Sequence, residues 1–224
     1  MRSHMYSFAR FLMAVMLAGF AQTIQAQNLN LLLQHTSVAF GADGVKRTFE
    51  FSEHVYRRAQ WVWVERVMPD APHSEQDHPH EGAEHRHLDV AAAARWVSRN
   101  ANGVTALRLV SSEDKAVVDI APVEYGNVGF DGSWETAYHL IDPAVLKRMK
   151  AGKLDGDLRT YERSEQGAKL TVVWNERLQF PVSVESSGTG GLRRTVVRQL
   201  PAPKVEPWNS LSGYQNKDYS DYLD

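Results

Sequence analysis

The chain has 224 residues, of which 43% are hydrophobic, and it contains no cysteine. Its 25 Lys and Arg side chains are nearly balanced by 27 Asp and Glu side chains, so the sequence offers no broad positive field and we expect no nucleic-acid partner. The lack of cysteine excludes disulfides, thiolate metal ligands and a cysteine nucleophile.

The first 26 residues have the layout of a secretory signal peptide. Basic residues precede the apolar run 11–21, and short polar residues then lead to Ala26. Since a helix needs about 20 apolar residues to cross a bilayer, this run favours a cleaved signal over a permanent anchor. We therefore expect cleavage after Ala21 or Ala26 and a periplasmic or secreted mature protein with no stable membrane anchor.

The first strands are expected at 48–56 and 61–67, which are rich in β-branched and aromatic residues. The short polar connection between them predicts a β-hairpin. Side chains alternate between the two faces of a strand, so Phe49, Phe51 and Val55 are expected on one face of the first strand.

An acidic segment at 73–87, the histidine segment, follows this hairpin and contains five of the nine histidines. They are His73, His78, His80, His85 and His87. Imidazole binds late first-row divalent metals, and two His-x-His pairs can each present two nitrogens to one ion because residues two apart in an extended chain project to the same side. The segment predicts a Zn or Cu site whose affinity falls as the pH drops through the imidazole range near ~6.5. The alternative is a solvated insertion whose composition cannot build a core.

Residues 89–100 predict a short helix, because an aspartate can cap its first amides, alanines favour helix and a polar, glycine-containing stop follows. A second hairpin is predicted from strands at 105–110 and 116–120. Residues 123–130 are expected to extend the same sheet.

The glycine- and aromatic-rich stretch 126–139 predicts a loop at the mouth of a ligand pocket. In this interpretation Trp134 and Tyr138 contact the ligand and His139 is a polar anchor. The alternative for His139 is a core or edge position in which a backbone hydrogen bond satisfies the ring.

A second helix is expected at 144–150, since Asp142 can cap its start and Pro143 suits its first turn. The last third predicts four more strands, at 158–163, 169–174, 182–185 and 194–200, with a glycine-rich hairpin turn at 186–191. The sequence therefore divides into a signal peptide (1–26), a single β-rich domain (27–200) and a tail rich in Pro and Tyr (201–224). The tail is expected to lie across the sheet or to hang loose.

The segment Tyr161–Glu185 resembles a hairpin of the LolA/RseB-like family of periplasmic lipoprotein carriers and sensors. The shared feature is a strand ending in an aromatic and acidic turn, Trp174-Asn-Glu-Arg-Leu-Gln, with Phe180-Pro-Val as the entry into the next strand. The resemblance covers 25 of the 224 residues, and no ligand-contacting residue of the family aligns here. It implies an unclosed antiparallel half-barrel whose concave face is covered by helices and receives an acyl chain or a partner segment.

The predicted fold class is α+β and β-rich, a curved antiparallel sheet that forms an unclosed half-barrel with two short helices. We expect no enzyme, because the sequence has no nucleophile elbow, phosphate-binding loop or zincin motif. The predicted function is that of a periplasmic binding, carrier or sensor-type protein that takes an apolar ligand or an envelope protein partner in its groove. The alternative is a metal-handling accessory protein that delivers copper or zinc to a partner. A metalloenzyme would need an ordered three-ligand site with an open position.

Overall fold

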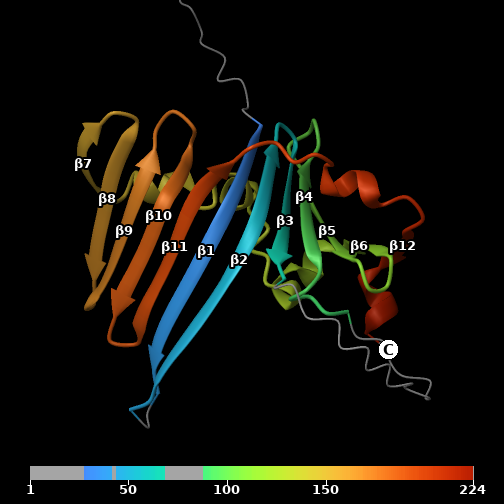
Figure 1. Cartoon of the computed structure of the whole chain (residues 1–224), viewed down its shortest axis with the longest axis horizontal. Helices are drawn as coiled ribbons and strands as arrows, with labels where there is room; N and C mark the ends of the chain where they lie inside the picture. The colour runs from blue at the N-terminus through green and yellow to red at the C-terminus, as the bar shows by residue number, and fades with distance from the viewer. Residues whose placement is uncertain (1–27, 42–43, 69–87, 224) are drawn as a thin grey trace, which may run out of the picture.

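A single twelve-stranded sheet forms the body of the protein (Figure 1). The computed structural model describes residues 28–41, 44–68 and 88–223. In chain order the strands are β1 (Leu29–Phe40), β2 (Lys46–Arg58), β3 (Trp61–Val67), β4 (Ala94–Arg99), β5 (Thr105–Ser111), β6 (Ala116–Ile120), β7 (Lys150–Asp155), β8 (Leu158–Glu165), β9 (Ala168–Asn175), β10 (Phe180–Gly188), β11 (Gly191–Leu200) and β12 (Gln215–Asp218).

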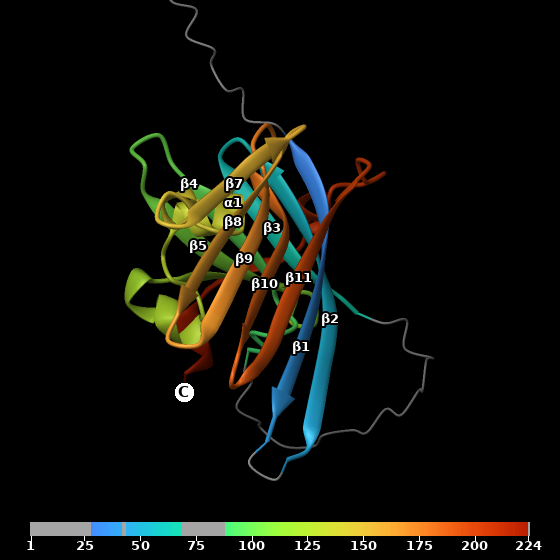
Figure 2. The same cartoon turned by 90° about the vertical axis from the view of Figure 1, so that its left-hand side faces the viewer.

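The strand order across the sheet is β12-β6-β5-β4-β3-β2-β1-β11-β10-β9-β8-β7. β12 runs parallel to β6, and the other neighbouring strands are antiparallel. β12 and β7 end the sheet on opposite sides, so the curved sheet stays unclosed (Figure 2). This arrangement confirms the predicted fold class.

Short helical segments lie on the hollow side of the curved sheet (Figure 2). They include α1 (Trp134–His139), α2 (Pro143–Leu146) and the 3₁₀ helix η1 (Pro122–Val128), while η2 (Pro207–Ser210) and η3 (Tyr219–Tyr222) belong to the C-terminal segment. The Ser133 hydroxyl accepts a hydrogen bond from the Thr136 amide at the start of α1, and the Asp142 carboxylate accepts one from the Ala144 amide at the start of α2. None of the helices in the described ranges is long and apolar enough to cross a membrane.

The main core lies on the inner face of the sheet, which we define as the face that carries α1 and α2. Leu31 and Val55 pair across β1 and β2, and Leu33 and Val197 pair across β1 and β11. All four side chains are at most 5% exposed. Alternate residues of a strand point to the same side, so Leu29, Leu31 and Leu33 of β1 all reach this core.

The C-terminal segment covers part of the opposite, outer face. There Trp63 belongs to an aromatic cluster on which Trp208 packs, with the ring centroids of Trp208 and Trp61 4.0 Å apart. Arg58 donates hydrogen bonds of 2.7 and 2.8 Å to the two carboxylate oxygens of Glu206 and so fastens the same segment. The tail therefore lies across the sheet, the first of the two placements that the sequence left open.

The helix predicted at 89–100 is wrong, because this stretch forms one turn followed by β4. The Asp89 carboxylate does accept hydrogen bonds from two amides of that turn, at 2.9 and 3.1 Å. From Ala94 onward, however, the chain pairs with β3 and β5. Val97 joins the inner core and Trp96 packs on the outer cluster, so strand pairing buries both faces and outweighs the modest helix propensity of the alanines.

Two further expectations need correction. Residues 123–130, expected to extend the sheet, form η1 and the turn after it, with Pro122 in the first turn, where a missing N–H costs nothing. The second helix begins as predicted at Asp142 and Pro143 but ends at Leu146 rather than near 150. The predicted hairpins at 48–67 and 105–120 and the four later strands are confirmed.

Candidate ligand cavity

A cavity of about 300 Å³ lies between the inner face of the sheet and the segment that contains α1. The strands β1 to β4 line it with Leu33, Glu53, Val55, Val64, Arg95 and Val97. The covering segment lines it with Gly129, Phe130, Asp131, Thr136, Ala137 and Leu140. Ligand pockets of proteins measure about 300–1,000 Å³, so this cavity has room for one small apolar group or a single chain.

The strand side of the cavity follows from the pairing register. Val55 pairs with Val64, and Val64 pairs with Arg95, so all three point to the inner face. Val97, two residues along β4, also points there. The cover contributes the small side chain of Ala137 opposite this apolar floor, and a small residue at this place leaves space between helix and sheet.

One end of the cavity is polar. The carboxylate of Glu53 lies 3.3 Å from a guanidinium nitrogen of Arg95 and 3.0 Å from Nε2 of His35. Because a carboxylate accepts hydrogen bonds, Nε2 of His35 carries the proton, and Nδ1 lies 3.0 Å from the hydroxyl of Thr195. The cavity therefore combines apolar walls with a fixed pair of opposite charges at one end.

This network keeps Glu53 ionised. Burial alone would raise the pKa of Glu53, but the hydrogen bond from His35 and the positive charges of Arg95 and Arg66 together hold it below its ordinary value. The ring of His35 also stacks on Phe51, with the centroids 4.5 Å apart. A ligand with a polar end would meet a preformed and charged set of partners here.

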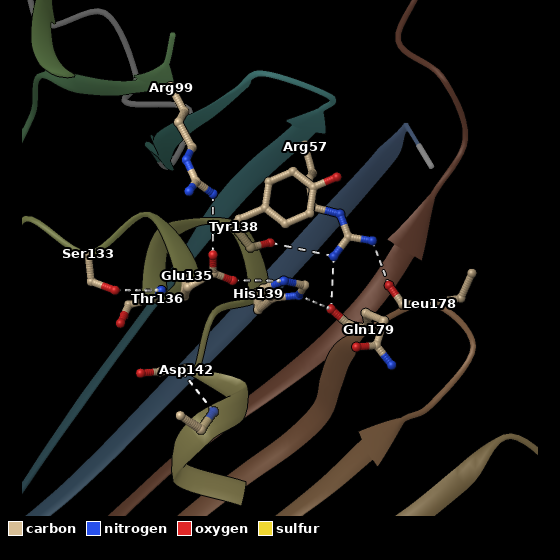
Figure 3. Close-up of polar contacts among 11 residues, drawn as sticks. Arg57, Arg99, Ser133, Glu135, Thr136, Tyr138, His139, Asp142, Leu178 and Gln179 are labelled. Atoms are coloured by element: carbon tan, nitrogen blue, oxygen red, sulfur yellow. Dashed lines mark hydrogen bonds and ion pairs between the residues drawn. The ribbon is translucent and has the colours of Figure 1, made fainter. Parts of the chain in front are cut away.

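Arg57 fastens the cover to the sheet (Figure 3). This residue lies on β2 and is 3% exposed. Its guanidinium donates hydrogen bonds to the carbonyl oxygens of Leu178 at 2.5 Å and Gln179 at 2.9 Å, and it lies 3.5 Å from the carbonyl oxygen of Tyr138 in α1. It also stands 4.7 Å from the ring centroid of Tyr138. One buried cation thus joins β2, α1 and the turn between β9 and β10.

The fastened segments carry backbone strain. Leu140, at the C-cap of α1, has φ 66°, and Gln179 has φ 56°. These left-handed conformations are uncommon for residues other than glycine and cost about 1–2 kcal/mol each. The carbonyl oxygen of Gln179 accepts hydrogen bonds from both Arg57 and His139, each at 2.9 Å, and these bonds hold the strained turn in place.

The structure places the three residues predicted from 126–139 beside the cavity rather than among its lining residues. Trp134 is buried in the core and packs on Tyr138, with the ring centroids 5.0 Å apart. His139 donates from Nδ1 to the Gln179 carbonyl, in agreement with the alternative given for it, and its Nε2 lies 3.4 Å from Glu135. Ligand contact by these three residues stays a prediction, although the helix they belong to does cover the cavity.

Sequence reasoning missed Glu53, Arg57 and Arg95. Their signal is a charged residue at an inner-face position of a strand, two residues from a buried valine, Val55 for Glu53 and Arg57 and Val97 for Arg95. The predicted metal ligands of the histidine segment lie outside the described residues. Within the described ranges, no group of three or more His, Asp or Glu side chains is placed to hold a metal ion.

A second depression, of about 620 Å³, lies mainly over the outer face. Its lining mixes polar side chains, among them Gln34, Glu50 and Arg194, with the apolar Phe51, Val67 and Val196. The smaller inner cavity is the better candidate because its walls are mainly apolar and a helix covers it.

No protein-family model matches the chain, and no curated protein matches it. Among solved structures, PNGF-II is similar with 10% identity and a TM-score of 0.37, covering 88% of this chain and 32% of that one, so this chain spans about a third of PNGF-II. A structure described as an outer membrane lipoprotein-sorting protein domain from Vibrio parahaemolyticus has 13% identity, a TM-score of 0.33 and coverage of 81% and 88%. A LolA superfamily protein from Nitrosomonas europaea has 9% identity, a TM-score of 0.31 and coverage of 82% and 94%. The last two names agree with the LolA/RseB-like resemblance, and at such TM-scores the likenesses carry no further argument.

Proposed function

We propose that the chain is a non-enzymatic binding protein of the cell envelope, of the carrier or sensor type, which holds an apolar ligand in the cavity under α1. The observation that carries this proposal is the helix-covered apolar cavity on the inner face of an unclosed sheet. The Glu53–Arg95 pair at one end suits a ligand with a polar terminus, such as a single-chain amphiphile.

Two features of the sequence support the same proposal. The signal-like N-terminus favours a periplasmic protein, and the hairpin at 161–185 resembles that of LolA/RseB-like carriers. The fastening of α1 by Arg57 supports a cover that holds its place over the cavity. The metal-handling alternative stays a prediction from the histidine segment alone.

Titration with dansyl-labelled undecanoic acid tests the proposal. Ala137→Phe places a ring in the cavity. If the ring displaces about two methylenes of the ligand, each of which contributes ~0.8 kcal/mol to the binding free energy when buried, the affinity should fall roughly tenfold. The matched control is Ala144→Phe, since Ala144 is exposed on α2 and does not line the cavity. Saturable binding that falls in the first variant and persists in the second is expected, whereas equal affinities in both variants would contradict the proposal.

A further inference from the structure

The tip of the β1–β2 hairpin exposes three large apolar side chains within ten residues. We call residues 40–49 the hairpin tip, of which 40, 41 and 44–49 are described. Phe40 and Phe49 are each 60% exposed and Val45 is 50% exposed. Among the large hydrophobic side chains that the described ranges leave exposed, these two phenylalanines are the only aromatic ones. Exposed apolar groups clustered in this way mark a contact surface.

Within the described ranges, no neighbouring strand covers these side chains of the hairpin tip. Pairing between β2 and β3 ends at Ser52 and Val67, so β2 from Lys46 to Phe51 pairs with β1 alone. Both views show the hairpin reaching past the neighbouring strands (Figures 1 and 2). The register places Phe49 on the inner face, two residues from Phe51, and Phe40 on the outer face. An apolar group on each side of a projecting ribbon suits immersion in an apolar medium better than packing on one surface.

The base of the hairpin tip is held firmly. The amide of Gly41 donates to the carbonyl of Val45 at 3.0 Å. β11 continues along β1 as far as Gly191, where a Cβ would collide with the carbonyl oxygen of Val38, so only glycine permits this close approach. A rigid ribbon can present apolar side chains without the entropy cost of ordering a loose loop.

Positive charge surrounds the apolar side chains. Lys46 and Arg47 belong to the hairpin tip, and Arg193 lies in the same row of the sheet as Phe49, since both pair with Ser37. All three are exposed. Two carboxylates oppose them in the sequence, that of Asp43 within the tip and that of Glu50, which is exposed directly after Phe49. Basic residues around inserted apolar groups are complementary to anionic lipid headgroups.

We propose that the hairpin tip docks on the surface of an anionic phospholipid bilayer, with Phe40, Val45 and Phe49 inserted and the cations on the headgroups. The inner-face row then runs from Phe49 at the bilayer to Val55 in the cavity floor, a span of roughly 20 Å at ~3.4 Å per residue. This row, which passes Phe51 and the carboxylate of Glu53, is the route by which a ligand with an apolar chain and a polar end passes between bilayer and cavity. The route rests on the proposed function, whereas the docking does not.

Flotation of the mature protein with vesicles tests the docking. The vesicles are phosphatidylcholine with phosphatidylglycerol, and phosphatidylcholine alone, at low and high salt. We expect flotation with the anionic vesicles, loss of it at high salt, and roughly tenfold or greater weakening in the double variant Phe40→Ser/Phe49→Ser and in Lys46→Glu. The matched control is Val123→Ser, because Val123 is 84% exposed on η1, outside the hairpin tip.

Three outcomes would overturn the docking: no flotation of the wild-type protein, undiminished flotation of the double variant, or loss of flotation in the Val123→Ser control. Self-association that the double variant abolishes, without any vesicle binding, would assign the tip to a second copy of the chain and would also overturn it. Unchanged unfolding curves show that the variants are folded. Failure of dansyl-undecanoic acid to bind in vesicle-free solution refutes the proposed function and leaves the docking result intact.

Discussion

Replacement of Arg57 by methionine tests whether this residue fastens α1 to the sheet. The two short hydrogen bonds to Leu178 and Gln179 involve a charged donor, and each such bond contributes about 1.5–3 kcal/mol. The 3.5 Å contact with Tyr138 is at the limit of a hydrogen bond and contributes little. Burial opposes the charged form and lowers the pKa of Arg57, so removal of the cation recovers part of the loss. We expect a net loss of about 3 kcal/mol in the free energy of unfolding.

Urea unfolding followed by tryptophan fluorescence measures this loss, and amide hydrogen exchange locates it. Exchange should accelerate at 134–140 and 175–179, the two segments that Arg57 joins. The matched control is Arg99→Met. The guanidinium of Arg99, on β4, also contacts α1, where it lies 3.4 Å from the carboxylate of Glu135, but its side chain is 42% exposed. Solvent screens that pair, so its loss should cost at most about 0.5 kcal/mol. A loss of unfolding free energy below ~1 kcal/mol for Arg57→Met, or amide exchange in both segments as slow as in the wild type, would refute the reasoning.

Three further predictions concern the remaining features. Glu53→Gln should weaken the loss of stability at acid pH. Because the native pKa of Glu53 lies below its ordinary value, the ionised side chain stabilises the fold above pH 4.5, and this contribution is lost as the pH falls through the native pKa. Free energies of unfolding in urea that fall in parallel for the wild type and the variant as the pH drops would contradict this. Trp208→Ala should lower the free energy of unfolding by about 2 kcal/mol, because the side chain is half-buried in an aromatic cluster. The control Val205→Ala should lower it hardly at all, since Val205 is 69% exposed, and equal unfolding midpoints for the two variants would refute this. Zn(II) or Cu(II) should bind saturably above the imidazole pKa of ~6.5 and weakly below it, and deletion of 73–87 should abolish binding while the fold remains. Absence of saturable micromolar binding in calorimetry would remove the metal site.

Alternation of side chains was enough to predict most of the sheet. Phe49, Phe51 and Val55 share the inner face as expected, because side chains two residues apart in a strand point to the same side. The central strand β1 was missed: Leu29, Leu31 and Leu33 share its buried face, but Leu32 lies between them and obscures the alternation. Local composition misled at 89–100, where alanines suggested helix and pairing with two neighbouring strands decided otherwise.

The cavity was less accessible to sequence reasoning. Ala137 and Val55 come from distant parts of the chain, and only the path of the covering segment brings them together. The ring of His139 drew attention as a polar residue among aromatics, while the residue that secures the helix is Arg57, an unremarkable arginine near the end of a strand. The sequence does not reveal the partners of a buried cation that backbone carbonyls hold, because every residue type has a backbone carbonyl.

The central claim is that an apolar ligand occupies the cavity on the inner face. The most direct measurement is a methyl NMR titration of the Leu- and Val-labelled protein with undecanoic acid. The account predicts ligand contacts and shift changes at Val55, Val64 and Leu140, and none at Val110 and Val117, which are buried in the outer-face cluster. Changes confined to the outer-face methyls, or no change at saturating ligand, would contradict it.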